Sequence, residues 1–185
     1  MKKEVTELII KDTIFLVLLI LFFAFGIGPG YVSSGSMEPA IRTGDVVLCN
    51  KLVYKIREPK RGDIVTFSVD GKKEKYCKRI IGLPGETIRF LDGKVYIDDV
   101  VLDEASYIGA EVRTDCDESF MVPKDSYFVM GDHREDSFDS RFWQEPYVKR
   151  EQIHARVILV LPTHGLLRPF ISSKEKCMQK AYLDL

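Results

Sequence analysis

An uncharged apolar run near the amino terminus limits most strongly what this chain can fold into. Residues 14–28 read IFLVLLILFFAFGIG and carry no charge. Uncharged residues on either side extend the run to residues 13–32. This stretch reaches about 20 residues, the length that an α-helix needs to cross the core of a bilayer. The run offers no polar face, which disfavours a surface helix of a soluble protein. It therefore predicts a single transmembrane helix at residues 13–32.

The charges around this run predict its orientation. Lys2, Lys3 and Lys11 precede the run, and the next cation along the chain is Arg42. Lysine and arginine favour the cytoplasmic side of a span, whereas acidic residues contribute little. We therefore expect residues 1–12 in the cytoplasm and the remainder of the chain outside the plasma membrane.

A cleaved secretory signal is the main alternative for this segment. Ala24, Phe25 and Gly26 resemble a small-x-small cleavage site. The apolar run is, however, longer than the usual apolar core of a signal peptide, and Ile27 continues it. We favour an uncleaved anchor.

The composition excludes several classes of function. The chain has 185 residues, enough for one domain beyond the anchor, and a net charge of −1. It has no basic stripe with interleaved aromatic residues, so we expect no nucleic-acid partner. No pair of its cysteines has C-x-x-C spacing, which argues against a redox centre or a metal site, and we expect no metal and no organic cofactor. Three full disulfide pairings are open to Cys49, Cys77, Cys116 and Cys177, and we favour free thiols over all three.

Short strand-like segments separated by turns come after the anchor. Asp92 and Gly93 suit a type I′ hairpin turn, and residues 123–125 predict a second hairpin. Regularly spaced strands of this kind predict a mostly β fold, either an antiparallel barrel or a folded sheet. The expected strands are residues 45–54, 64–69, 75–81, 87–91, 94–97, 119–122, 126–130 and 156–161.

The stretch SGSMEP at residues 34–39 contains a candidate nucleophile. Ser36 lies between Gly35, which permits unusual backbone angles, and Met37, with Pro39 close behind. A hydroxyl on such a rigid turn can project into a cleft. An isolated motif of this kind is more often an ordinary linker, so its weight depends on partner residues further along the chain.

A serine hydroxyl needs a neighbouring base, and two residues compete for that role. His133 lies in a polar loop. Lys78 lies on a predicted strand, where Tyr76 and Ile80 share its face and could bury its amine. Burial lowers the pKa of a lysine from about 10.4 by several units, so that the neutral, basic form becomes accessible. The alternative for Lys78 is an exposed strand lysine, the common fate of this residue type.

Acids, arginines and serines are concentrated in GDHREDSFDSR at residues 131–141. This stretch does not fit the spacing of a calcium-binding loop. It fits better a loop that is held by internal Asp–Arg pairs and presents a serine hydroxyl to a buried amine.

Four stretches together resemble the sequence boxes of bacterial type I signal peptidases, which are serine proteases with a Ser–Lys dyad. They occur in the family's order, after an anchor placed as in the family, and the resemblance extends to about Leu161. The stretches are SGSMEP at 34–39, RGDIVTF at 61–67, KRIIGLPGE at 78–86 and GDHREDSFDSR at 131–141.

The resemblance implies a domain organisation. It places an antiparallel β catalytic domain of the type shared with LexA-like self-cleaving repressors at residues 33–170, after the single transmembrane helix. A small β insertion is expected at about 87–125, and a tail at 171–185.

The resemblance also implies roles for individual residues. Ser36 would be the nucleophile and Lys78 the general base. Ser34 would help the Ser36 backbone N–H form the oxyanion hole, and Ser137 would orient the lysine amine. Asp139 and Arg141 would form the supporting salt bridge, further from the reaction. The apolar substrate pockets would be lined by residues that match the family less closely, namely Val32, Met37, Ile41 and Tyr76.

The function implied is removal of signal peptides from exported preproteins by cleavage after a small-x-small site. The implied partners are preproteins, the lipid membrane and the secretion translocon. A self-cleaving repressor would need a DNA-binding helix pair where the apolar run stands. A non-catalytic tethered β domain would leave the joint presence of Ser36, Lys78 and Ser137 unexplained.

Overall fold

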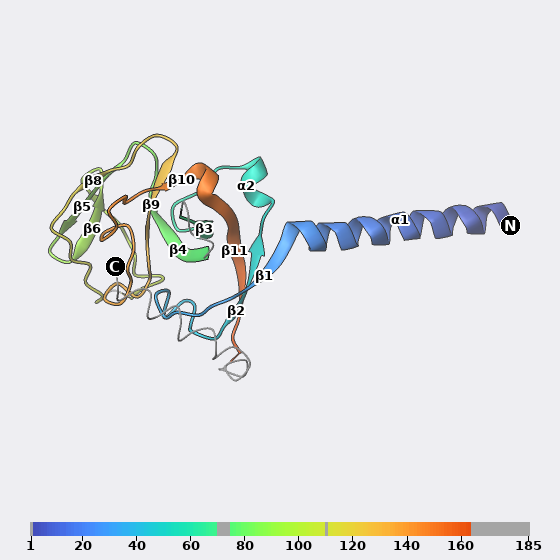
Figure 1. Ribbon diagram of the computed structural model, residues 1–185, viewed down its shortest axis with the longest axis horizontal. Coiled ribbons are helices and arrows are strands. Elements are labelled where there is room, and N and C mark those ends of the chain that lie inside the picture. The colour runs from blue at the N-terminus through green and yellow to red at the C-terminus, as the bar shows by residue number, and fades with distance from the viewer. Residues whose placement is uncertain (1, 70–74, 110, 164–185) are drawn as a thin grey trace.

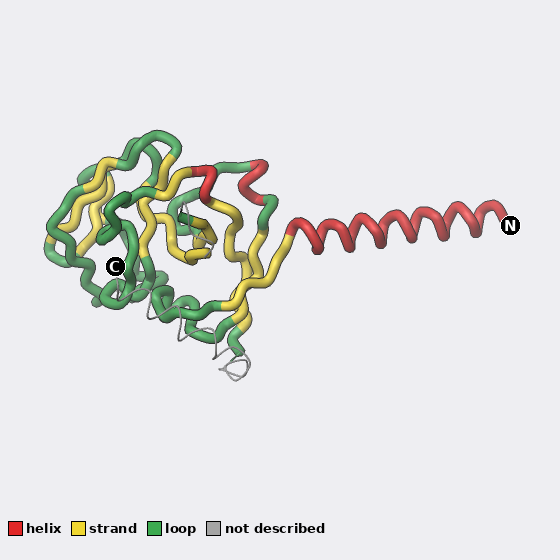
Figure 2. Tube along the Cα trace, viewed as in Figure 1, coloured by secondary structure: helices red, strands yellow, loops and turns green. Residues whose placement is uncertain are grey.

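A long helix projects away from a domain of two antiparallel sheets in the computed structural model of the protein (Figure 1). The structure describes residues 2–69, 75–109 and 111–163. The predicted tail at 171–185, the predicted domain end at residue 170 and Cys177 lie outside these residues. Apart from the long helix and two short helical turns, the described chain consists of strands and loops (Figure 2). The prediction of a mostly β, antiparallel fold is confirmed.

The first helix and the predicted anchor have different bounds. Helix α1 spans Lys2–Gly26, and strand β1 begins directly after it and spans Ile27–Tyr31. The last residues of the predicted span 13–32 are therefore extended. The sequence Gly-Pro-Gly at 28–30 explains this difference, because glycine and proline are the poorest helix formers. Proline is accepted in β1 because β1 is an edge strand.

Over the residues that the structure describes, no helix satisfies both the length and the hydropathy that a membrane span requires.

The larger sheet carries the loops of the candidate site. Its seven strands are ordered β1-β2-β11-β3-β4-β9-β10, and every neighbouring pair is antiparallel. The remaining strands of this sheet are β2 (Val46–Asn50), β3 (Ile64–Ser68), β4 (Lys75–Gly82), β9 (Ser126–Met130), β10 (Val148–Lys149) and β11 (Ile153–Leu161), and the 3-10 turn Arg150–Gln152 joins the last two.

The smaller sheet lies within the stretch predicted as an insertion. Its order is β7-β6-β5-β8. Between β5 and β6, Asp92 and Gly93 have φ values of 51° and 75°, the positive φ that a type I′ turn requires at both central positions. The hairpin predicted from Asp92 and Gly93 is therefore confirmed. The strands are β5 (Thr87–Leu91), β6 (Lys94–Ile97), β7 (Val100–Val101) and β8 (Phe120–Met121).

The strand predicted at 45–54 is shorter than expected. Strand β2 ends at Asn50, whose side-chain oxygen accepts hydrogen bonds from the backbone N–H groups of Leu52 and Val53 at 2.9 and 3.0 Å. Asparagine favours turns because its side chain bonds the backbone two residues on. The chain then forms the short helix α2, Val53–Ile56.

The second predicted hairpin is wrong. Strand β8 pairs with β5, whereas β9 pairs with β4 and β10, so the two strands flanking residues 123–125 belong to different sheets. Their apolar side chains explain this outcome. Phe120 and Phe128 pack at 4.7 Å between ring centroids in the core between the sheets instead of facing each other along one ladder.

Two of the three clusters of buried apolar residues that the structure describes lie next to the loops of the candidate site. One lies between the sheets and includes Ile81, Met130 and Phe128 from the larger sheet with Ile88 and Val95 from the smaller one. Both clusters remove large apolar side chains from water, the dominant favourable term in folding. The other cluster lies under the loop after β1 and consists of Val32, Met37, Ile41, Val47, Cys49, Ala155 and Val157.

Candidate active site

The loop between β1 and β2 holds Ser36 on a tight turn. The Glu38 N–H donates to the Gly35 carbonyl at 2.9 Å, and the Ile41 N–H donates to the Met37 carbonyl at 2.9 Å. Met37 and Ile41 are fully buried and anchor the turn to the core. Ser36 remains half-buried above them, and Ser34 is exposed.

The Ser36 turn packs against the loop after β9. The backbone N–H of His133 donates to the Ser36 carbonyl at 3.1 Å. A Cβ on Gly131 would overlap both the Ser36 carbonyl oxygen and the Ser137 side chain. Only a glycine at position 131 therefore allows the backbone of Ser36 and the hydroxyl of Ser137 to lie this close together.

Lys78 reaches the same place from β4. Its side chain is buried, with the residue 4% exposed, and its Nζ donates to Ser137 Oγ at 3.0 Å. Burial lowers the pKa of the Lys78 amine to about 8, although the nearby Asp139 carboxylate opposes the shift. Roughly one molecule in ten therefore carries a neutral amine at pH 7, far more than for an ordinary lysine.

Asp139 connects the parts of the loop. Its carboxylate accepts hydrogen bonds from Ser137 Oγ at 2.7 Å and from the Gly131 N–H at 2.9 Å. It also pairs with Arg141, whose Nε lies 2.9 Å from Oδ1. Both charged side chains are buried. One carboxylate thus orients the hydroxyl that receives the lysine amine and the glycine that contacts Ser36.

The nucleophile and the base are not hydrogen-bonded to each other. Among the described residues, no hydrogen bond joins Ser36 Oγ to Lys78 Nζ, and the amine is directed to Ser137. Catalytic hydrogen bonds are often long or poorly aligned in free enzymes and tighten when substrate binds. The arrangement can supply a buried basic amine, a hydroxyl beside it and a loop that holds both.

Comparison with known proteins shows the family to which the chain belongs. The sequence profile of the family described as "Signal peptidase, peptidase S26" matches residues 5–161. The chain belongs to this family. The resemblance found in the sequence is thereby confirmed.

Individual relatives carry the same name. The chain is 39% identical over 146 residues to the probable signal peptidase I-2 of Synechocystis sp., a match that covers 74% of this chain and 65% of the relative. It is 36% identical over 149 residues to a signal peptidase I of Bacillus licheniformis, covering 76% of this chain and 80% of that one. The chain thus spans just under two thirds of the length of the Synechocystis relative.

A solved structure also matches. It is a signal peptidase I from Enterococcus faecalis V583, with 30% sequence identity and a TM-score of 0.47. The match covers 56% of this chain and 99% of the solved one.

The four pocket residues that the family resemblance implied do not all lie together. Val32, Met37 and Ile41 belong to the cluster beneath the Ser36 turn. Tyr76 packs against a different cluster, where its ring stacks on Phe67 at 5.8 Å between centroids. Met37 and Ile41 are 1% and 0% exposed, so they form the floor under the turn rather than an open surface.

The thiols of the described residues are unpaired. Cys49, Cys77 and Cys116 are free, in agreement with the preference for free thiols over a disulfide framework. Cys77 is the neighbour of Lys78, and burial raises the pKa of its thiol to about 12. This thiol therefore stays protonated near neutral pH and is a poor nucleophile.

His133, the rival base, meets Ser36 through its backbone. Its N–H bonds the Ser36 carbonyl, and its ring Nδ1 is buried without a hydrogen-bond partner among the described residues. Neither feature activates the Ser36 hydroxyl. The structure brings Lys78, not the His133 ring, to Ser137.

Two ion pairs beside the site were not predicted from the sequence. Arg79 binds both oxygens of Asp132 at 2.7 and 2.6 Å, and Arg134 binds both oxygens of Glu104 at 2.9 and 2.5 Å. Three of these residues lie inside the recognised stretches, but Glu104 lies in the insertion. Partners 53 and 30 positions apart leave no local pattern that could reveal the pairing.

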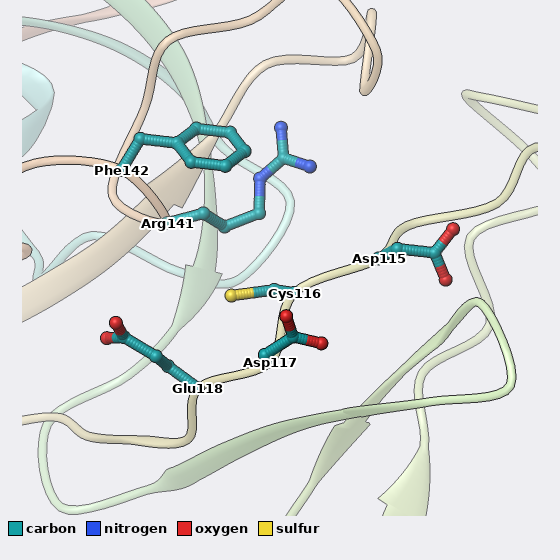
Figure 3. Close-up of a pocket in the computed structure, with 6 residues that line it drawn as sticks. All are labelled: Asp115, Cys116, Asp117, Glu118, Arg141 and Phe142. Carbon is teal, nitrogen blue, oxygen red and sulfur yellow. The ribbon is translucent and has the colours of Figure 1, made fainter.

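A cavity of about 320 Å³ opens next to the site, on the side of the insertion (Figure 3). It lies between residues 115–118 and the part of the loop that carries Arg141 and Phe142. Neither Ser36 nor Lys78 lines it. Across the described ranges, no group of three or more His, Cys, Asp and Glu side chains could hold a metal ion.

Proposed function

We propose that this protein is a membrane-anchored serine endopeptidase that removes amino-terminal signal peptides from exported preproteins. Cleavage occurs after a small-x-small site and uses Ser36 and Lys78 as a dyad. The observation that carries the proposal is the buried amine of Lys78, held at 3.0 Å by Ser137 in the loop that packs on the Ser36 turn. Family membership supports the same reaction.

The first step forms an ester with the enzyme. Neutral Lys78 takes the proton of the Ser36 hydroxyl as the Ser36 oxygen attacks the carbonyl carbon of the scissile peptide bond. The Ser34 hydroxyl and the Ser36 N–H stabilise the oxyanion, and removing one such donor costs about 3–4 kcal/mol in other enzymes. The C–N bond then breaks, and the lysine returns the proton to the departing amine.

The second step releases the acyl group. Lys78, neutral again, takes a proton from water, and the hydroxide that forms attacks the ester carbonyl. The C–O bond to Ser36 breaks, and the proton returns to the serine oxygen. Ser137 and Asp139 keep the amine in place throughout, because Ser137 Oγ bridges Lys78 Nζ and the Asp139 carboxylate.

The choice of small residues is a consequence of the space under the turn. Met37 and Ile41 fill the core directly beneath Ser36 and are fully buried. A side chain of the substrate next to the scissile carbonyl finds little room above them, so we expect alanine or glycine at that position.

The apolar helix supports anchoring in the plasma membrane, with the amino terminus in the cytoplasm and the β domain outside. Residues 14–28 contain no charge, and lysines precede them. Water is a poor surrounding for large apolar side chains. Among the α1 side chains that the structure describes, ten of this kind are 40–69% exposed, namely Ile9, Ile10, Ile14, Phe15, Leu16, Val17, Leu18, Leu19, Ile20 and Phe25. A lipid surrounding accounts for them, and the secretion translocon remains a proposed partner at the same membrane.

Cleavage of a purified preprotein in detergent tests the proposal. The wild type should cut after the small-x-small site, as shown by amino-terminal sequencing of the product. Ser36→Ala and Lys78→Ala should each lower the rate by at least about 10³-fold, as in other enzymes that lose a member of the catalytic group.

His133→Asn is the matched control, because its backbone N–H can still bond the Ser36 carbonyl. It should keep most of the activity. If His133→Asn is inactive while Lys78→Ala cleaves, the Ser–Lys assignment is wrong. If the wild type cuts no preprotein and Ser36 does not react with a serine-directed acylating probe, the peptidase function itself is wrong.

A further inference from the structure

One segment of the insertion contacts two elements that surround the candidate dyad, the loop after β9 and strand β4. Glu104, Tyr107 and Thr114 lie between β7 and β8, far from Ser36 in the sequence. Glu104 is 9% exposed and Thr114 is 1% exposed, so this contact is part of the interior. No recognised catalytic stretch contains these residues.

The first contact is made with the loop after β9. Both oxygens of Glu104 accept hydrogen bonds from Arg134, which is 3% exposed, and Thr114 Oγ1 accepts another from Arg134 Nη1 at 2.6 Å. The Nε of the same guanidinium donates to the Gly131 carbonyl at 3.0 Å. Arg134 therefore links the insertion directly to the glycine on which Ser36 and Ser137 converge.

The second contact is made with β4. The Arg79 guanidinium lies over the Tyr107 ring at 4.2 Å from its centroid, and the Tyr107 hydroxyl donates to Glu104 Oε1 at 2.6 Å. Burial and the Glu104 carboxylate raise the pKa of Tyr107, so its hydroxyl remains a donor. Arg79 comes directly after Lys78 in the chain and binds Asp132, the residue directly after Gly131.

We infer that Glu104, supported by Tyr107, is a positioning residue that holds Gly131 and Ser137 against the Lys78 amine. The inference rests on the proposed function of the site but names a residue outside the family's recognised stretches. Glu104 neutralises Arg134 where both are buried, while the Nε–H of Arg134 bonds the Gly131 carbonyl. Without that carboxylate, the guanidinium would turn toward other acceptors, and the loop would loosen at Gly131.

A loosened loop would change the surroundings of the Lys78 amine. The charged or titratable groups that act on this amine are Asp139, Cys77, Arg141 and Asp132. Three of them, Asp139, Arg141 and Asp132, are on the loop that Arg134 holds. Loosening admits water to the amine, which raises its pKa, and moves the Asp139 and Asp132 carboxylates, whose loss would lower it. Burial is the largest cause of the lowered pKa of Lys78, so we expect the pKa to rise.

Glu104→Gln tests this role because it keeps the shape of the side chain and removes its charge. We expect kcat to fall about 10- to 100-fold with a much smaller change in KM, because a misplacement of about 1 Å costs on that order in rate. Competitive labelling of the Lys78 amine with acetic anhydride across pH, read by mass spectrometry, should show a titration moved toward the ordinary lysine value of about 10.4. Tyr107→Phe, which removes one hydrogen bond and keeps the ring under Arg79, should produce a smaller shift in the same direction.

Glu58→Gln is the matched control. Glu58 also pairs with an arginine, Arg150 at 2.7 Å, and accepts a hydrogen bond from the Tyr127 hydroxyl at 3.2 Å, and neither partner belongs to residues 131–141. Glu58→Gln should leave both the cleavage rate and the titration of Lys78 at wild-type values.

The labelling separates failure of the inference from failure of the proposed function. A wild type that cuts no preprotein and whose Ser36 does not react with the acylating probe refutes the peptidase function, yet a shifted Lys78 titration in Glu104→Gln would still support the positioning role. If Glu104→Gln and Tyr107→Phe both leave the titration of Lys78 as in the wild type, the inference is overturned, whatever the cleavage rate. A lower rate with an unchanged titration would show a merely structural contact.

Discussion

At the scale of single residues, the chemistry depends on an energetically unfavourable placement. Lys78 is buried, and this burial is what brings the pKa of its amine down to about 8. An exposed lysine would stay protonated near neutral pH and could not accept a proton from Ser36. Burial therefore suits Lys78 to its proposed role as a base and lowers the stability of the fold.

The pH dependence of cleavage should track the titration of Lys78. Because only the neutral amine is basic, kcat/KM should rise about tenfold per pH unit below about pH 8 and level off above it. A pH series with a peptide substrate measures this acid limb. A rate that is flat between pH 6 and about 8 would contradict the role of Lys78.

Removing the buried charge should stabilise the fold. The pKa of Lys78 in the folded state, about 8, lies below the unfolded value of about 10.4, so the unfolded state binds more protons between these values. The penalty is therefore fully present below about pH 8 and fades as the pH rises toward the unfolded value. Lys78→Met should raise the free energy of unfolding at pH 7 by up to about 3 kcal/mol, and by less at about pH 10.

Urea unfolding at the two pH values measures this difference. Ser36→Ala is the matched control, because it removes activity without removing a buried charge. A Lys78→Met variant less stable than the wild type at pH 7 would show that the amine stabilises the fold on balance.

At the scale of elements, the loop between β9 and β10 assembles the site. Its residues from Gly131 to Arg141 supply the hydroxyl for Lys78, the carboxylate that orients it and the close backbone contact to Ser36. The same loop receives Arg79 from β4 and Glu104 from the insertion. Strands from the larger sheet and a segment beside the smaller one therefore meet on one short stretch of chain.

Gly131→Ala should separate the parts of the site. The added Cβ would overlap the Ser36 carbonyl and the Ser137 side chain, and neither can yield without moving a backbone segment. We expect kcat to fall by about 100-fold or more, with a loss of about 1–3 kcal/mol in the free energy of unfolding. Preprotein cleavage and urea unfolding measure the two effects.

Gly28→Ala is the control for this substitution, because a Cβ there meets only the flexible end of Lys51. It should leave both quantities nearly unchanged. A fully active Gly131→Ala variant would refute the close contact between the Ser36 turn and the loop.

Asp139→Asn should weaken the loop itself. The substitution leaves Arg141 buried without its carboxylate partner, and breaking such a pair costs about 3–5 kcal/mol. The fluorescence of Trp143, whose ring packs on Phe67, reports the unfolding. Glu58→Gln, in a more exposed pair, should cost no more than about 1 kcal/mol. Equal costs for the two variants would show that burial adds nothing to the Asp139–Arg141 pair.

At the scale of the whole molecule, the helix and the β domain are joined without a linker. Helix α1 ends at Gly26, and β1 begins at Ile27 and pairs with β2 along its full length. The Ser36 turn begins a few residues after β1. The edge strand of the sheet therefore sets the distance between the proposed membrane anchor and the site.

Two truncations should separate anchoring from catalysis. Removing residues 2–26 leaves β1 in place, so the shortened protein should stay active on a soluble peptide while no longer sedimenting with membrane vesicles. Removing residues 2–31 also deletes β1, whose hydrogen bonds to β2 support the Ser36 turn, and should abolish activity. If the shorter truncation still sediments with vesicles, α1 is not the anchor.

Local patterns in the sequence predicted a large part of this architecture. The Asp92-Gly93 turn, the strand carrying Lys78 and the strand ending at Met130 are predictable from alternation and turn residues within a few positions of each other. The candidate site was indicated differently, by residue types that can form a nucleophile and a base and by the resemblance of the stretches around Ser36, Lys78 and Ser137 to a known family. Their roles in catalysis remain predictions, to be decided by the variants of Ser36, Lys78 and His133.

The sequence by itself determined that the chain is mostly β, that it contains an uncharged apolar run at residues 14–28 and that Ser36, Lys78 and Ser137 are the candidate reactive groups. Only the tertiary structure decided that β8 joins the smaller sheet and that Tyr76 packs apart from Met37 and Ile41. It also decided that Glu104 forms a buried salt bridge with Arg134. The physical reason is distance along the chain. Turn chemistry and alternation act between near neighbours, whereas the partner of a buried charge is chosen by the packing of the two sheets against each other.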